Sequence, residues 1–299
     1  MQKPPYLKKG DKVAIVSTAR KISLEEIQPA IDVLNEWDLE LALGVNLFKE
    51  DHQFSGTTSE RISDFQLALD DESIKAIFCA RGGYGTVKII DELDFSRFIQ
   101  NSKWVVGYSD VTVFHNHINE NFNIETLHAT MPINFPVNTK KSLESLKSAL
   151  FGEELKYEFG MHQYNKKGVG EGLLVGGNLS IIYSLTGTKS QLNTRGKLLF
   201  IEDLDEYLYH IDRMMMNLKR AGMLDELAGL IVGGMSDMND NTIPYGKTAV
   251  EIIIESVKGY AYPVCFNFPA GHILDNRTLI MGREASLILE NTGQLKFSF

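Results

Sequence analysis

The sequence predicts an α/β fold in two domains: an N-terminal domain built on a parallel β-sheet, and a smaller, β-rich C-terminal domain. Three observations support this prediction. Short apolar runs alternate with segments of helical periodicity up to about residue 130. The pattern loosens around Pro132 and Pro136, then resumes after residue 167 with more short apolar runs and glycines. The length of 299 residues also suits two domains.

The N-terminal domain, residues 1–135, is expected to contain several strands, each an apolar run that ends in a polar or glycine-rich loop. These runs are residues 12–19, 39–45, 74–80, 104–106 and 124–127. Helices are expected between them: Ser23 and Glu26 form a capping box before one, and residues 62–69 carry apolar side chains at helical spacing. The alternation indicates parallel strands with right-handed crossovers, a flavodoxin-like arrangement whose functional loops lie at the carboxyl ends of the strands.

Residues 136–167 are expected to form a linker that contains one amphipathic helix, and residues 168–299 the C-terminal domain. Within that domain, Asn178 follows two glycines and is expected to open a helix. Further strands are expected at residues 198–201 and 230–232, further helices at 209–218 and 250–254, and several short strands in the last forty residues.

The composition excludes several classes of protein. The chain carries 30 Lys and Arg against 39 Asp and Glu, a formal net charge of −9, which argues against nucleic acid or an anionic membrane as the main partner. Cys79 and Cys265 each lie in an apolar run and are predicted to be buried thiols, and no metal-ligand spacing or cofactor motif is present. The N-terminus lacks an apolar leader and no run is long enough to span a membrane, so a cytoplasmic location is expected.

Ser109 is the candidate nucleophile. It follows the apolar run 104–106 and precedes a predicted helix, so its hydroxyl would stand at the carboxyl edge of the sheet. The N–H groups at the start of that helix would face whatever forms there. The alternative is that Ser109 is only the N-cap of the helix, because serine is an ordinary cap.

A serine nucleophile needs a base, and the base needs an orienting acid. Among seven histidines, His272 is the best candidate base, because it lies in a glycine-flanked loop that could place an imidazole freely. His128 follows a predicted strand and is a plausible substrate contact. Glu202 is the candidate acid, because it closes the apolar strand 198–201. The alternative for Glu202 is a carboxylate that caps the following turn.

The segment R-G-G-Y-G at 81–85 is the second candidate element. Its glycines free backbone N–H groups to approach a ligand closely, so Gly82 or Gly83 could supply one oxyanion donor and the Asp110 N–H the other. Tyr84 and Asn178 are expected to contribute to the same oxyanion and substrate-binding region. The alternative for the glycines is a plain tight turn.

A second G-x-S-D sequence, at 234–237, competes with the one that contains Ser109. A loop follows it, M-N-D-N-T-I-P-Y-G, so Ser236 would lack the helix N-terminus that supports an oxyanion. Substitution of Ser236 is therefore expected to change activity little.

The motifs together resemble the LD-carboxypeptidase family, which includes murein tetrapeptide carboxypeptidases and microcin C immunity peptidases. The matching pieces run in order along most of the chain: A-R-G-G-Y-G (80–85), G-Y-S-D-V-T (107–112), T-L-H (126–128), G-G-N-L-S (176–180), L-L-F-I-E-D (198–203), I-D-R-M (211–214), and the G-H and T-L-I-M-G pieces within 271–282. The resemblance implies a metal-free serine peptidase with Ser109 as nucleophile, Glu202 as orienting acid and His272 as base. It also implies that the cleft lies between the domains, and that the protein is a homodimer.

The substrate implied by the resemblance is a small muropeptide, from which the enzyme releases the terminal D-alanine during peptidoglycan recycling. The segment E-D-L-D-E-Y-L-Y-H-I-D-R-M at 202–214 resembles the murein branch more than the microcin branch. Two alternatives remain: a peptidase for microcin C-type aminoacyl nucleotides, and a two-domain binding protein that holds a small ligand without chemistry.

Overall fold

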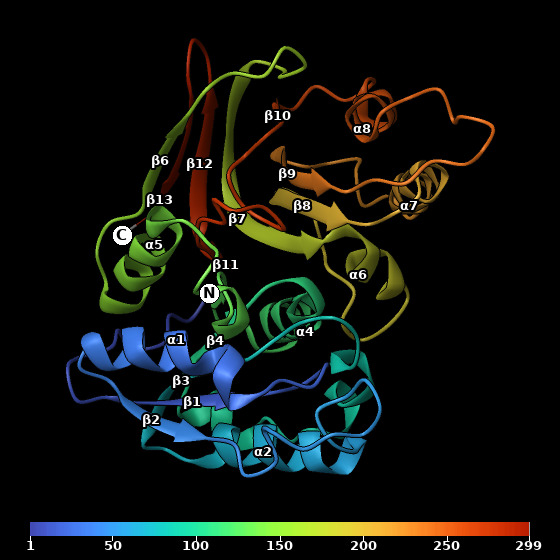
Figure 1. Cartoon of the computed structure of the whole chain (residues 1–299). Coiled ribbons are helices and arrows are strands. Elements are labelled where there is room, and N and C mark those ends of the chain that lie inside the picture. The colour runs from blue at the N-terminus through green and yellow to red at the C-terminus, as the bar shows by residue number, and fades with distance from the viewer. Residues whose placement is uncertain (299) are drawn as a thin grey trace.

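A computed structural model of the chain describes residues 1–298, which form two β-sheets with helices packed on them (Figure 1). The first sheet has six strands in the order β11-β5-β4-β3-β1-β2. Their bounds are β1 Lys12–Val16, β2 Glu40–Leu43, β3 Ile74–Cys79, β4 Trp104–Gly107, β5 Thr126–His128 and β11 Leu279–Met281. The five N-terminal strands pair in parallel, as the alternation predicts, and β11 pairs antiparallel with β5.

Helices cover both faces of this sheet. They are α1 Leu24–Glu36, α2 Thr58–Asp70, α3 Ser96–Gln100 and α4 Thr112–Phe122, with short 3₁₀ turns η1 Thr86–Lys88, η2 Ile90–Glu92, η3 Ser109–Val111 and η4 Pro132–Asn134. The predicted capping box of Ser23 and Glu26 begins α1. Side chains alternate along β3: Phe78 packs into the core that contains α1, whereas Ile77 packs into the core that contains α2. The two helices therefore lie on opposite faces, with β1 and β2 between them in Figure 1.

The second sheet has seven strands in the order β10-β9-β8-β7-β12-β13-β6. Their bounds are β6 Lys156–Phe159, β7 Gly168–Asn178, β8 Leu198–Leu204, β9 Gly229–Ser236, β10 Val264–Cys265, β12 Glu284–Leu289 and β13 Gly293–Phe297. Strands β7 to β10 pair in parallel, whereas β7, β12, β13 and β6 pair antiparallel. The second half is thus a mixed sheet, and the predicted α/β class with a β-rich second part is confirmed.

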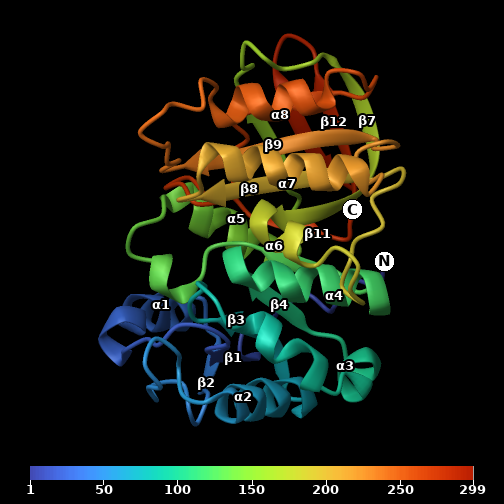
Figure 2. The same ribbon diagram turned by 90° about the vertical axis from the view of Figure 1, so that its right-hand side faces the viewer.

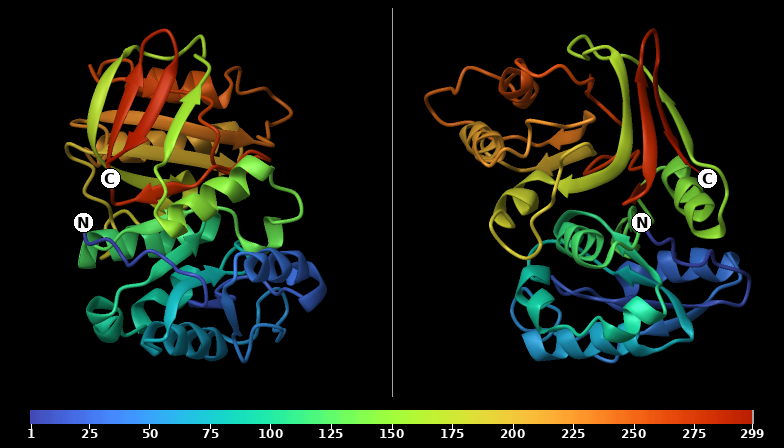
Figure 3. Two further views of the ribbon diagram at one scale, coloured as in Figure 1. Left: turned by 90° about the vertical axis from the view of Figure 1, so that its left-hand side faces the viewer. Right: turned by 180° about the vertical axis from the view of Figure 1, so that it is seen from behind.

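The remaining helices are α5 Lys140–Phe151, α6 Leu179–Ser184, α7 Leu208–Arg220 and α8 Ala249–Val257. Helices α7 and α8 lie side by side over β8 and β9 (Figure 2). The antiparallel strands and both termini lie on the side away from these two helices (Figure 3). The segment 136–167 carries the expected helix, α5, and also β6, which extends the second sheet by pairing with β13. The domain limits at 135 and 168 remain predictions.

The two sheets share one apolar core. A single cluster of buried side chains contains Val13 and Ile15 of β1 together with Leu198 and Phe200 of β8. Strand β11 reinforces this connection, because it comes late in the chain but completes the edge of the first sheet. Within residues 1–298, no helix combines the length and apolar character needed to cross a membrane. The same residues contain no group of three or more His, Cys, Asp or Glu side chains arranged to hold a metal ion.

Candidate active site

Ser109 occupies a strained turn directly after β4. Its backbone has φ 63°, in the left-handed region that side-chain-bearing residues seldom adopt. The strain turns the chain sharply from the strand into η3 and α4, the geometry of a serine elbow. Neither η3 nor α4 is capped by a side chain, so Ser109 does not act as the N-cap that the alternative required.

Glu202 in β8 and His272 in the loop between β10 and β11 form a close pair. Nδ1 of His272 lies 2.6 Å from Oε2 of Glu202, and the His272 backbone N–H donates to the same oxygen at 3.2 Å. Glu202 is fully buried at the end of β8, whereas the His272 side chain is 12% exposed. The contact uses Nδ1 and leaves Nε2 of His272 for another partner.

The electrostatics of this pair favour an ion pair. Burial by itself would lower the pKa of His272, but the charge and hydrogen bond of Glu202 outweigh it, so the pKa of His272 is raised. Burial would likewise raise the pKa of Glu202, but the charge and hydrogen bond of His272 reverse this, so the pKa of Glu202 is lowered. The neighbouring Asp203 behaves differently: burial, then the charge of Glu202, raise its pKa to about 7.

Gly271 allows His272 to approach Glu202 so closely. It has φ +107°, and a Cβ at this position would come within 2.8 Å of Cβ and Oε2 of Glu202. Its N–H donates to Oδ1 of the buried Asn276 at 2.8 Å. On the other side, Oγ of Ser236 donates to the His272 carbonyl at 2.8 Å. Hydrogen bonds at Gly271 and at both the N–H and the carbonyl of His272 therefore fix the loop that carries the imidazole.

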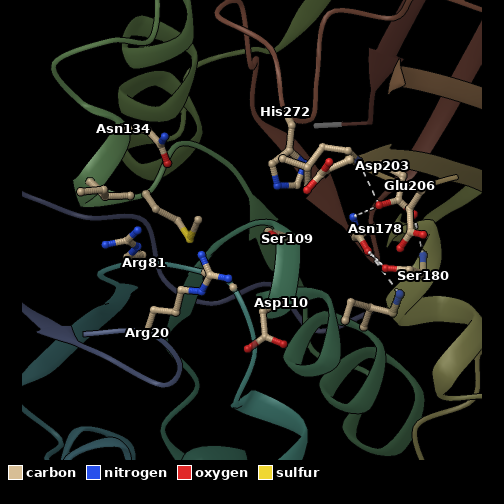
Figure 4. Close-up of a pocket in the computed structure, with 17 residues that line it drawn as sticks. Arg20, Arg81, Ser109, Asp110, Asn134, Asn178, Ser180, Asp203, Glu206 and His272 are labelled. Atoms are coloured by element: carbon tan, nitrogen blue, oxygen red, sulfur yellow. Dashed lines mark hydrogen bonds between the residues drawn. The ribbon is translucent and has the colours of Figure 1, made fainter. Parts of the chain in front are cut away.

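Ser109 and His272 line the same cavity, which has a volume of about 550 Å³ (Figure 4). Asn178 connects the two halves of this cavity, because its N–H donates to Oγ1 of Thr112, at the start of α4, at 2.9 Å. Its side chain donates to Asp203 at 2.9 Å and caps α6. The carboxyl end of β4, which precedes Ser109, therefore lies next to the carboxyl end of β7, which precedes α6.

Most of the other predicted site residues lie around Ser109. Gly82, Gly83 and Asp110 line the cavity, and a Cβ on Gly82 would lie 3.2 Å from Oγ of Ser109. The expected oxyanion donor is the backbone N–H of Asp110. Its carboxylate accepts a hydrogen bond from the Thr86 N–H at 2.8 Å. Tyr84 does not line the cavity: its ring is 46% exposed and tilts against Phe54, because the chain turns at the glycines on either side of it.

Other histidines lie away from the cavity surface. His128 is fully buried, with its ring 5.7 Å from that of Tyr108, so the expected contact with substrate is wrong. Its two ring nitrogens have no hydrogen-bond partner among the described residues. Nε2 of His115 contacts the Gly107 carbonyl at 2.8 Å, and Nδ1 of His117 contacts Oγ of Ser190 at 2.9 Å. Both of these histidines therefore have structural contacts.

The sequence reasoning missed the charged walls of the cavity. Arg20 and Arg81 line one side, and Asp203 and Glu206 line the other (Figure 4); Asp205 also lines the cavity. A signal for Arg20 was present, because it follows the first predicted strand and so lies at a carboxyl strand end. Asp203 lies in β8 directly after Glu202, and Asp205 and Glu206 follow the end of that strand.

The sequence matches models of two known domains. Residues 13–129 match the LD-carboxypeptidase N-terminal domain, and residues 171–287 match the LD-carboxypeptidase C-terminal domain. The chain is 33% identical to the probable murein peptide carboxypeptidase of Bacillus subtilis, over 95% of this chain and 91% of that protein. It is 26% identical to the murein tetrapeptide carboxypeptidase of Pseudomonas aeruginosa, over 92% of each chain.

Solved structures share the fold. A muramoyltetrapeptide carboxypeptidase from Oxalobacter formigenes superposes with a TM-score of 0.87 at 25% identity, covering 96% of this chain and 99% of that one. The microcin C7 self immunity protein MccF superposes with a TM-score of 0.88 at 21% identity, covering 98% of each chain, a likeness that concerns the fold alone. With both domain models matched in order and a relative at 33% identity over almost the whole length, this chain belongs to the LD-carboxypeptidase family of peptidases.

Proposed function

We propose that this protein is a serine carboxypeptidase that removes the terminal D-alanine from the murein tetrapeptide L-Ala-D-Glu-(diamino acid)-D-Ala. The observation that carries the proposal is the 2.6 Å contact between His272 and Glu202 in a cavity that Ser109 also lines. The names of the relatives support the substrate class. The bond cleaved would join the L-centre of the diamino acid to the D-centre of the alanine.

The proposed mechanism is acyl transfer through Ser109. Nε2 of His272 takes the hydroxyl proton while Oγ of Ser109 attacks the carbonyl carbon, and backbone N–H groups of Gly82 or Gly83 and of Asp110 stabilise the oxyanion. The imidazolium then gives its proton to the leaving nitrogen of D-alanine. Water, deprotonated by His272, hydrolyses the acyl-enzyme and restores the serine. Glu202 holds Nδ1 of the imidazole as the N–H tautomer and offsets its positive charge.

The test is chromatography of tetrapeptide and pentapeptide after incubation with purified protein. We expect D-alanine from the tetrapeptide only, because the terminal bond of a pentapeptide ending in D-Ala-D-Ala joins two D-centres. Release from the pentapeptide would contradict the L,D specificity. Inert tetrapeptide together with cleavage of a microcin-type aminoacyl nucleotide would favour the immunity branch. A protein that cleaves neither and does not react with a fluorophosphonate would be a binding protein.

Two further proposals accompany this function. A homodimer, which the family resemblance implies, is measured by light scattering of the purified protein. A cytoplasmic location would suit recycled wall fragments rather than the intact wall, and fractionation of cells that produce the protein measures it.

Activity should persist in EDTA, because the proposed chemistry uses only protein groups. A loss of activity that added zinc restores would contradict the proposed mechanism.

A further inference from the structure

Arg20 lines the cavity with a guanidinium that has no partner among the described residues, although its backbone is held in place. It follows β1, is exposed to solvent, and lines the same cavity as Ser109. Its backbone is held in place, because Oγ of Ser17 donates to the Arg20 carbonyl at 2.9 Å and Phe54 bridges to it on the other side. Across residues 1–298, its guanidinium has no ion pair and no hydrogen bond to another group of the protein. A guanidinium in this state is suited to a carboxylate or phosphate supplied by a ligand.

Arg20 and Ser109 lie against two consecutive glycines, Gly83 and Gly82. A Cβ on Gly83 would come within 2.7 Å of Cγ and Cδ of Arg20, so the arginine side chain lies directly across that glycine. A Cβ on Gly82 would lie 3.2 Å from Oγ of Ser109. The Arg20 side chain and the Ser109 hydroxyl therefore lie against two consecutive residues of the same turn.

The opposite wall of the cavity has the opposite charge. Asp205 and Glu206 line it together with Asp203, whose pKa of about 7 leaves that carboxyl only partly ionised at neutral pH. Asp203 and Glu206 lie across Ser109 from the two arginines in Figure 4. The Asp203 carboxylate is occupied by N–H groups of Asn178 and Ser180, both at 2.9 Å. Glu206 lies 2.6 Å from Nδ1 of His210. A ligand with a carboxylate at one end would be repelled by this wall and attracted by the other.

We propose that Arg20 binds the free α-carboxylate of the residue that the enzyme removes. In a peptide, that carboxylate carbon is three covalent bonds from the scissile carbonyl carbon, so the group that binds it must line the same cavity as Ser109, as Arg20 does. The acidic wall then forces a single direction of binding, with the C-terminus toward Arg20. This assignment rests on the proposed function and explains why cleavage stops at the terminal residue: an internal peptide bond offers Arg20 no charge.

Arg81 is less suited to this role, because it already has partners within the protein. Its Nη1 donates to the Lys21 carbonyl at 3.3 Å and lies 3.7 Å from Oε1 of Glu26. We therefore assign the carboxylate to Arg20, and expect Arg81 to contribute only to the positive potential of that wall.

The experiment compares two tetrapeptides that differ only at the C-terminus, one with a free acid and one with a carboxamide. We expect the wild-type protein to cleave the acid with a kcat/KM about ten- to a hundredfold above that of the amide, the range that a charge-assisted hydrogen bond provides. In Arg20→Gln, kcat/KM for the acid should fall by a similar factor and the ratio of acid to amide should approach one. Arg20→Lys should restore part of the ratio, since it keeps the charge but not the bidentate geometry.

Matched controls separate this proposal from its alternatives. Lys21→Gln removes the same charge from the neighbouring residue, whose ammonium pairs with Glu50 outside the cavity, and should keep the wild-type ratio. An unchanged ratio in Arg20→Gln, or a ratio near one in the wild-type protein, would overturn the proposal. So would a ratio that collapses in Arg81→Gln but not in Arg20→Gln. If the wild-type protein cleaves neither peptide, the proposed function itself fails.

Discussion

At the scale of single residues, Ser109 has a strained backbone at the position of the proposed nucleophile. A residue with φ 63° costs about 1 kcal/mol or more relative to ordinary backbone, and the surrounding contacts must hold it there. The turn is built where the fully buried strand β4 meets α4, so the fold can sustain this cost. In this turn conformation the Ser109 side chain lines the cavity and does not cap the helix that follows.

Replacement of this hydroxyl tests the assigned nucleophile. Ser109→Ala should lower kcat for the tetrapeptide by about a millionfold, because no other group can form the acyl-enzyme. The variant should fold normally, since the Ser109 hydroxyl caps neither η3 nor α4. Single-turnover assays with labelled tetrapeptide measure the effect, and circular dichroism checks the fold.

Ser236→Ala is the matched control for this variant. Its hydroxyl donates to the His272 carbonyl, a bond worth about 1 kcal/mol, so its loss should reduce activity only a few-fold. An active Ser109→Ala protein together with an inactive Ser236→Ala protein would mean that the other G-x-S-D sequence carries the nucleophile.

The pH dependence tests the pairing of His272 with Glu202. As a base, His272 must be neutral, and its raised pKa means that activity rises with pH through a value above 6.5. In Glu202→Gln the attraction is lost while burial remains, so the pKa of His272 should fall and the acid limb of kcat/KM should move to lower pH. The rate at the plateau should also fall, by about 10⁴-fold, since the tautomer is no longer held. A limb that stays at the wild-type pH would contradict the assignment of Glu202.

At the scale of elements, the loop from β10 to β11 decides where the imidazole lies. The position of Gly271 is the most restrictive in this loop, with φ +107° and the Glu202 side chain directly against it. Gly271→Ala should therefore disrupt the pair, with a loss of activity and a lower free energy of unfolding. Gly259→Ala is a suitable control, because a Cβ there would meet nothing within 4 Å. Activity assays and urea unfolding of both variants measure the difference, and full activity in Gly271→Ala would contradict the restriction.

Much of this arrangement could be predicted at the level of elements, because the signals are local. The apolar runs that become β1, β3, β4 and β8 end at polar or glycine-rich loops, and such ends collect at one edge of a parallel sheet. The sequence analysis expects short strands in the last forty residues, but the place of β11 in the first sheet could not be predicted, because its pairing with β5 joins segments far apart in the sequence. The pairing of β6 could not be predicted for the same reason, because its partner β13 lies far from it in the sequence.

Individual side-chain contacts were less predictable than the elements. The pairing of Glu202 with His272 was inferred from the resemblance, since their separation in the sequence carries no distance information. The outward position of Tyr84 and the burial of His128 depend on how the chain turns and packs around them. The same is true of Arg20, whose importance depends on the close approach to Gly83.

At the scale of the whole molecule, the shared core should make the two halves unfold together. The cluster that joins Val13 to Phe200 leaves little freedom for one sheet to melt while the other persists. We expect a single thermal transition with equal calorimetric and van't Hoff enthalpies. Ile280→Ala, at a buried position in β11, should lower the free energy of unfolding by about 2–5 kcal/mol and move the whole transition. Two separated transitions, only one of which moves in this variant, would contradict this coupling.

The late position of β11 in the chain also determines when the protein can begin to act. During translation, Ser109 and the five parallel strands leave the ribosome long before Leu279 does, so β5 presents an unpaired edge throughout that interval. His272 is made only shortly before β11. Until that point the nascent chain has the proposed nucleophile but neither the proposed base nor the strand that completes the first sheet. The proposed base and the strand that covers the exposed edge of β5 are thus synthesised within a few residues of each other.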